Sequence, residues 1–125
     1  MVLGSRPSCT DMFAGCSNLI SVNKIEGTLQ SCARMFSSCD KLVTIPELNC
    51  SNLNSNAAMA DMFDGCPMLS NESLNNILNT CTKSSITKSS YKTLKTIGLT
   101  SAQATTCEGL SNYQAFLDAG WTTGY

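Results

Sequence analysis

Eight cysteines are the chemically most reactive side chains of this 125-residue chain. Their closest recurrent spacing is C-x6-C, at 9/16 and 32/39. Structural zinc sites favour cysteines two to four residues apart, often with histidine, and the chain has no histidine. Without histidine, a Cys-His or Ser-His-Asp catalytic centre is excluded. We therefore expect no enzyme, no catalytic residue, no metal site and no cofactor.

The cysteines belong to a repeat. A Met-Phe pair occurs at 12–13, 35–36 and 62–63, and in each copy a cysteine and a leucine follow at fixed distances. The apolar spacing i, i+3, i+4, i+7 predicts one face of a two-turn helix in each unit. The expected structural core is Met12, Phe13, Cys16, Leu19, Met35, Phe36, Cys39, Leu42, Met62, Phe63, Cys66 and Leu69.

The residues after each predicted helix, "NLISV" and "KLVTIPEL", are rich in β-branched side chains and predict one short strand each. A helix-strand unit of this size cannot bury its apolar face alone, whereas stacked copies share a core. We expect an α/β fold: a short solenoid with a small parallel sheet. Its units are about 9–31, 32–58 and 59–69 within residues 1–69, with an enlarged loop at 50–56.

Residues 70–125 break the repeat and are expected to cap it, so that the whole chain forms one structural domain. Ser70 is the predicted N-cap of a helix whose apolar stripe contains Leu74, Ile77, Leu78 and Cys81. A strand is expected within 91–99, a helix from Thr100 or Ser101, and another from Ser111 with Gly120 after its end. The N-terminal end has no such cap, which suggests a longer repeat protein or self-association through that end.

The cysteines of the predicted helices lie too far apart for a disulfide within one unit, since a two-turn separation is about 10 Å. We predict buried free thiols that act as small apolar side chains. Cys50, in the expected loop, is the cysteine that we predict to be exposed.

The charge pattern excludes several partners. The net charge is −1 and only 14% of residues are charged, so the lysines between 83 and 95 predict a solvated face and no nucleic-acid site. No apolar run approaches the roughly 20 residues of a membrane-spanning helix, and membrane insertion is not expected. The opening "MVLGSRPSC" is too short and polar for a secretory signal peptide.

The motif "MF-x-x-C-x-x-L", present three times in residues 9–69, resembles the Met-Phe variety of BspA-like leucine-rich repeats. These repeats occur in bacterial surface lipoproteins and related phage proteins. The resemblance implies a leucine-rich-repeat solenoid with an adhesion or recognition role at a cell surface, in a secreted protein or on a virion. It implies no catalytic residues.

Two functions remain open. The first is a recognition module that binds a host protein or glycan through the repeat face. Its candidate residues are the exposed strand positions Ile20, Ser21, Val43 and Thr44 and the loop residues Asn52 and Asn54. The alternative is an architectural C-terminal cap of a longer repeat protein, without a ligand of its own.

Overall fold

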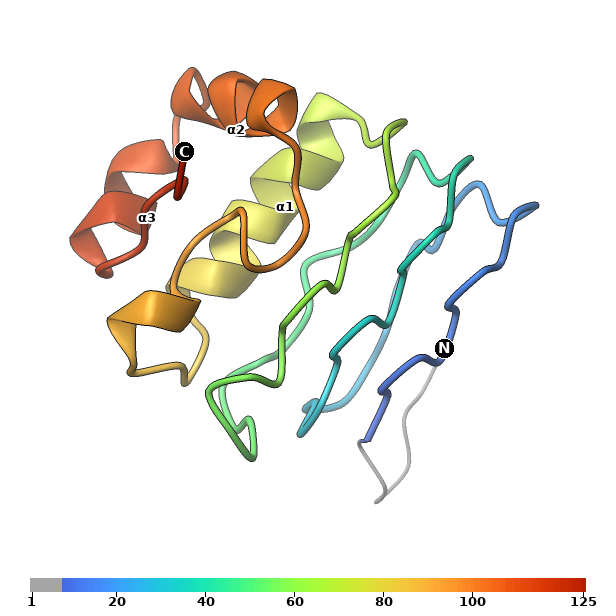
Figure 1. Cartoon of the computed structure of the whole chain (residues 1–125), viewed down its shortest axis with the longest axis horizontal. Coiled ribbons are helices and arrows are strands. Elements are labelled where there is room, and N and C mark those ends of the chain that lie inside the picture. Colours follow the sequence, from blue (N-terminus) through green and yellow to red (C-terminus); the bar gives the residue numbers. More distant parts are fainter. Residues whose placement is uncertain (1–7) are drawn as a thin grey trace.

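The computed structural model describes residues 8–125. The chain winds through coils that lie side by side, and the helices pack at one end of this stack (Figure 1). Each coil begins with a turn segment, and we use this name for residues 9–16, 32–39 and 59–66. A return segment, 17–31 or 40–58, leads to the next coil. The elements are α1 (Asn71–Thr82), the 3₁₀ helix η1 (Ser89–Tyr91), α2 (Ser101–Glu108) and α3 (Tyr113–Asp118).

The predicted helix-strand solenoid with a parallel sheet is wrong, because residues 8–125 contain no sheet. Pairing is limited to four isolated parallel bridges: Ser8–Ser31, Ser21–Thr44, Thr28–Asn49 and Thr93–Thr122. The return segments are held by scattered bonds, such as the 2.8 Å bond from the Val22 N–H to the Thr44 carbonyl. The strand expected within 91–99 is also absent, since turns follow the single bridged residue Thr93.

The turn segments are not helices, because residues with a left-handed backbone recur inside them. The φ angles are 60° at Asp11, 54° at Arg34 and 53° at Asp61. Four residues later, φ is again positive at Gly15, Ser38 and Gly65. An α-helix cannot pass through this region of backbone conformation. Each turn segment is instead a series of tight turns.

Two sets of backbone hydrogen bonds stabilise each series of turns, one within the turn segment and one to the neighbouring coil. Within the first turn segment, the N–H groups of Met12, Ala14 and Cys16 donate to carbonyls three residues earlier. The alternate N–H groups, at 9, 11, 13 and 15, donate to carbonyls of the second coil at 31, 33, 35 and 37. The second coil repeats this arrangement toward the third, from 32, 34, 36 and 38 to 58, 60, 62 and 64.

The side chains of the turn segments form a continuous core. The rings of Phe13, Phe36 and Phe63 stack with centroid distances of 5.5 and 5.7 Å. The thiol of Cys39 donates to the Phe13 carbonyl at 3.0 Å, and that of Cys66 does the same to the Phe36 carbonyl. The apolar spacing thus identified the buried positions of the second and third coils correctly, although the backbone between them is not helical.

The helices of the cap agree with the predicted signals. Ser70 caps α1 by accepting from the Ser73 N–H, and Thr100 forms a capping box with Gln103 at the start of α2. The next helix, α3, begins after Asn112, one position later than the predicted Ser111 start. Gly120 follows its C-cap with φ of 89°. No helix in the described residues is long and apolar enough to span a membrane.

Helix α1 follows the third turn segment in place of a return segment, and its side chains make the hydrogen bonds to the second return segment. The Ile45 N–H donates to Ser73 Oγ at 2.9 Å, and Asn76 Nδ2 donates to the Ile45 carbonyl at 2.9 Å. The Leu48 N–H donates to Thr80 Oγ1 at 3.0 Å. Because these three side chains occupy positions i, i+3 and i+7, they line one side of the helix. This end of the stack is therefore covered, and the N–H groups of Ile45 and Leu48 are paired.

The cysteines are mostly buried, as predicted, but the exposed cysteine is not the one that we predicted. All eight are free, and seven are buried. Cys16 is exposed because it lies on the first coil. Cys50, predicted to be the exposed one, is only 1% exposed because the return segment turns it into the core.

Candidate functional site: the open edge of the first coil

The six predicted binding residues do not form one site. Ile20 and Ser21 are exposed on the first return segment, and Val43 and Thr44 lie beside them, half-buried. The N–H groups of Val43 and Thr44 both donate to the Ile20 carbonyl, so these two residues serve the contact between coils. Asn52 and Asn54 are exposed at the other end of the second return segment and do not converge with the other four.

The predicted core residues divide according to their coil. Those of the second and third coils are all buried. In the first coil, Met12 is 41% exposed, Cys16 is exposed, and Phe13 and Leu19 are half-buried. Met12 and Cys16 are therefore not core residues, because within the described chain the first coil has a neighbouring coil on one side only.

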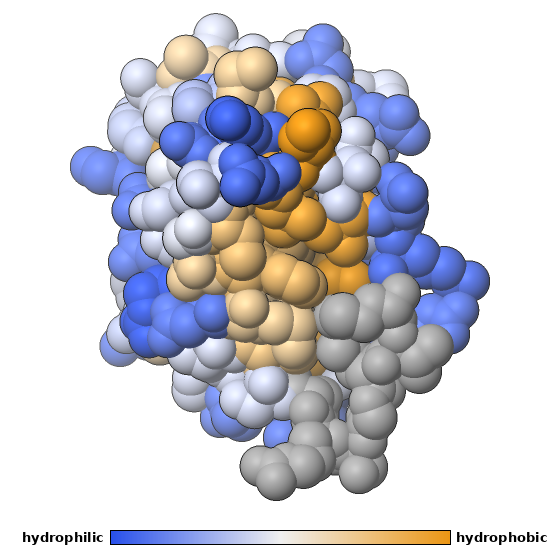
Figure 2. Space-filling view, turned by 90° about the vertical axis from the view of Figure 1, so that its right-hand side faces the viewer, coloured by the Kyte–Doolittle hydropathy of each residue, from blue (hydrophilic) through white to orange (hydrophobic). Residues whose placement is uncertain are grey.

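The outer side of the first coil is the most distinctive surface of the molecule. We call it the open edge, and it comprises Thr10, Met12, Phe13, Ala14, Leu19, Ile20, Ser21 and Val22. Ile20 is 59% exposed, and Phe13, Leu19 and Val22 pack only partly against the core. A hydrophobic band with polar margins runs over this end of the molecule (Figure 2).

Backbone carbonyls give the open edge its polarity. In the second coil, the carbonyls of residues 33, 35 and 37 accept N–H groups from the first coil. The equivalent carbonyls of the first coil are those of Thr10, Met12 and Ala14, and none accepts a hydrogen bond from residues 8–125. Seven of the eight N–H groups of the first turn segment are directed inward or used within the turns, at residues 9 and 11–16. The turn segment therefore presents mainly acceptors on its outer side.

A column of alternating charges crosses the coils at the left-handed position. Arg34 donates to both carboxylate oxygens of Asp11, at 2.8 and 3.1 Å. These hydrogen bonds from Arg34 lower the pKa of the Asp11 carboxyl. Asp11 in turn raises the pKa of Arg34, and the charge of Asp61 adds to this effect. All three groups are exposed, so the column contributes little to stability.

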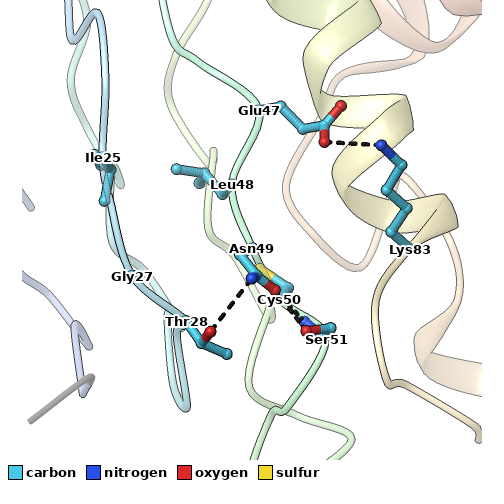
Figure 3. A pocket seen from close by; sticks show the side chains of 9 residues that line it. All are labelled: Ile25, Gly27, Thr28, Glu47, Leu48, Asn49, Cys50, Ser51 and Lys83. Carbon is cyan, nitrogen blue, oxygen red and sulfur yellow. Dashed lines mark hydrogen bonds and ion pairs between the residues drawn. The ribbon is translucent and has the colours of Figure 1, made fainter. Parts of the chain in front are cut away.

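A second candidate is a hollow of about 360 Å³ between the return segments and the end of α1 (Figure 3). Its polar groups are already engaged with one another. Asn49 Nδ2 donates to Thr28 Oγ1, Ser51 donates to the Asn49 side-chain oxygen, and Lys83 pairs with Glu47 at 3.0 Å. Few polar groups are left to orient a ligand there, which makes this hollow a weaker candidate than the open edge.

The remaining reactive groups do not form a catalytic constellation in the described part of the chain. No three histidine, cysteine, aspartate or glutamate side chains among residues 8–125 are placed to hold a metal ion. Burial raises the pKa of the thiols of Cys66 and Cys107 to about 12. Such thiols are protonated at neutral pH and are poor nucleophiles.

The sequence contained one usable signal that the prediction missed. Ser73, Asn76 and Thr80 form a polar stripe beside the apolar stripe of α1, which indicates a helix that must satisfy a neighbouring backbone. The open edge had no comparable signal, because the direction of backbone hydrogen bonds cannot be deduced from side-chain types.

Comparisons with known proteins add no assignment: the chain matches no protein family, no curated protein and no solved structure.

Proposed function

We propose that this chain is a non-catalytic protein-binding module that holds a polypeptide segment of its partner against the open edge. One observation carries the proposal. The two ends of the coil stack differ: α1 and the segments after it cover the last coil, whereas the first coil presents exposed apolar side chains beside carbonyls that accept no hydrogen bond from residues 8–125. An uncovered backbone edge of this kind favours pairing with another chain.

The chemistry of the edge describes the partner. It must supply backbone N–H groups at alternate residues, to reach the carbonyls of Thr10, Met12 and Ala14. It must also supply an apolar side chain for the uncovered face of Phe13. A polypeptide coil of the kind found in this chain meets these requirements. A glycan offers hydroxyl donors but not this regular spacing, which makes a protein the better partner.

Two-fold self-association fits the open edge less well. Such pairing brings the carbonyl row of one turn segment against the same row of its copy, acceptor facing acceptor. The donors at the other end of the stack are occupied, since the N–H groups of Asp61 and Phe63 bind the carbonyls of Thr96 and Ile97. The partner is therefore a different polypeptide segment.

The architectural role is the second candidate, and the side-chain ladder of α1 favours it. A helix that satisfies the last coil so completely is suited to ending a stack. On this reading the segment on the open edge is a coil of the protein that the cap completes. The resemblance to bacterial surface and phage repeats supports a location at a cell surface, in a secreted protein or on a virion for either role.

A tandem duplication tests whether the edge accepts a coil. A second copy of residues 9–31 is inserted between Ser8 and Cys9, and a scrambled copy of equal composition is the control. We expect the true copy to raise the free energy of unfolding and the denaturant m-value, because more surface is buried in the folded state. If both insertions give the same values, the open edge does not accept a coil.

Methionine oxidation provides a local measurement in the same proteins. Met12 of the original first coil is 41% exposed, and Met68, next to α1, is 56% exposed. Peroxide should oxidise both residues in the unmodified chain. In the duplicated chain Met12 should be protected while Met68 reacts as before. Continued reaction of Met12 would contradict the proposal.

A further inference from the structure

Four buried thiols gather at the end of the core near the hollow: Cys9, Cys32, Cys50 and Cys81. The sulfur atoms of Cys32 and Cys50 are 3.8 Å apart, and both side chains are at most 1% exposed. Burial, and then the neighbouring Cys50, raises the pKa of both Cys9 and Cys81. The contact with Cys50 and burial also raise the pKa of Cys32. The contact between Cys32 and Cys50 is therefore the close one in this group.

The pair closes one coil upon itself. Cys32 begins the second turn segment, and Cys50 lies near the middle of the return segment that follows it. The two residues are 18 positions apart, and they meet because the coil returns across the core. The repeat spacing in the sequence concerns cysteines of the turn segments, and it gives no indication of this pair.

The hollow borders one member of the pair. Cys50 is among the residues that line it, together with Asn49 and Ser51 at its polar side (Figure 3). Cys50 is only 1% exposed and Cys32 is 0% exposed, so an oxidant reaches the Cys50 sulfur when the return segment beside the hollow opens locally.

We infer that Cys32 and Cys50 are an oxidisable pair that a small-molecule disulfide, such as oxidised glutathione, converts into an intrachain disulfide. The sulfur atoms must approach from 3.8 Å to about 2.0 Å, which side-chain rotation can provide. The site is a covalent modification site, separate from the open edge, and its existence does not depend on the proposed binding function.

The reaction balances in two exchange steps. Cys50, as thiolate, attacks one sulfur of oxidised glutathione, so that a mixed disulfide forms and one glutathione thiolate leaves. The Cys32 sulfur then attacks the Cys50 sulfur while its proton passes to the leaving group, which releases the second glutathione as a thiol. The two cysteine protons end on the two glutathione molecules. Two protein thiols are oxidised and one glutathione disulfide is reduced.

Peptide mapping identifies the bond. The whole chain carrying Cys16→Ser, which removes the exposed thiol, is incubated with oxidised glutathione, and the remaining thiols are then alkylated. Cleavage after lysine and arginine and before aspartate leaves Cys32 alone in peptide 25–34 and Cys50 alone in peptide 42–60. We expect these two peptides to be recovered as one linked species that separates on reduction.

Alternative pairings give different products. A bond from Cys50 to Cys9 or Cys81 would link peptide 42–60 to 1–10 or 64–83. Dominance of either product, or recovery of alkylated Cys32 after prolonged oxidation, would overturn the inference. Oxidation of the unfolded chain in denaturant is the control, and it shows which mixture of disulfide-linked peptides forms when the fold does not bring the cysteines together.

A stability measurement gives a second readout. The bond should raise the thermal midpoint by roughly 10 °C, and reduction should reverse this shift. Cys107→Ser, at a buried thiol in the cap, is the matched control and should keep both the linked peptides and the shift. Cys50→Ala should lose both. An equal shift in Cys50→Ala would contradict the assignment even where peptide recovery is poor.

Discussion

Replacing Thr80 with valine tests how α1 closes the coil stack. Thr80 Oγ1 accepts the Leu48 N–H at 3.0 Å and donates to the Asn76 carbonyl at 2.8 Å. Thr80 is 2% exposed and Leu48 is 3% exposed, so water cannot replace the hydroxyl. Valine keeps the shape and the branched Cβ but leaves the Leu48 N–H without an acceptor. We expect a loss of about 1–3 kcal/mol in the free energy of unfolding.

Thr82→Val is the matched control, because the Thr82 hydroxyl donates only to the Leu78 carbonyl of its own helix, at 2.8 Å. Its replacement should change stability by no more than about 0.5 kcal/mol. Urea unfolding followed by circular dichroism measures both variants, with an unchanged m-value expected. Faster amide exchange at Leu48 in the Thr80→Val protein is the local readout. Equal losses in the two variants would refute the role assigned to the α1 side chains.

Three further predictions concern the turn segments. Phe36→Ala should cost about 3–5 kcal/mol in urea unfolding, because this fully buried ring stacks on both sides, and Phe13→Ala should cost clearly less; equal costs would contradict a stack that is open at Phe13. Gly98→Ala should lower the thermal midpoint far more than Gly15→Ala, because a Cβ at 98 would lie 2.4 Å from the Asp64 nitrogen, whereas a Cβ at 15 meets no atom within 4 Å. Both glycines have positive φ, so the difference between them isolates the steric clash. A short pulse of iodoacetamide at neutral pH should alkylate Cys16 first; rapid alkylation of most of the eight cysteines would show that the thiols are not buried.

The helix starts of the cap could be predicted because their signals are local, whereas the strand expected within 91–99 is absent. Ser70 and Thr100 carry side chains that bond the first free N–H groups of a helix, and the apolar stripe of α1 continues from such a start. The beginnings of α1 and α2 follow from these residues alone. The repeat positions were equally accessible, since a side chain that recurs once per coil meets the same environment each time.

The backbone of the turn segments could not be predicted from the same pattern. Apolar spacing of i, i+3, i+4, i+7 is shared by an α-helix and by tight turns that repeat every four residues. Asp11, Arg34 and Asp61 adopt positive φ although none of them is glycine, so their residue types do not indicate this conformation. Gly15 and Gly65 also have positive φ, next to the last residue of their turn segments.

The candidate site was predicted only in part. Ile20 and Ser21 do lie on the open edge, because both belong to the first return segment and are exposed. Asn52 and Asn54 were chosen as loop residues, and loop membership does not decide which face of a molecule a side chain reaches. The carbonyl row depends on which way the peptide planes tilt, and that property has no counterpart in the identity of the side chains.

The three turn segments have equal length, whereas the second return segment is four residues longer than the first. The regular backbone hydrogen bonds between coils belong to the turn segments, and these bonds set the spacing between coils. The four extra residues lie near 50–56. They do not change this spacing, because the first and second coils make the same set of hydrogen bonds from their turn segments to the next coil. Genes for such chains can therefore gain or lose short stretches in the return segments and still encode coils in register. The return segments can therefore change the shape of the surface, while the turn segments maintain the fold.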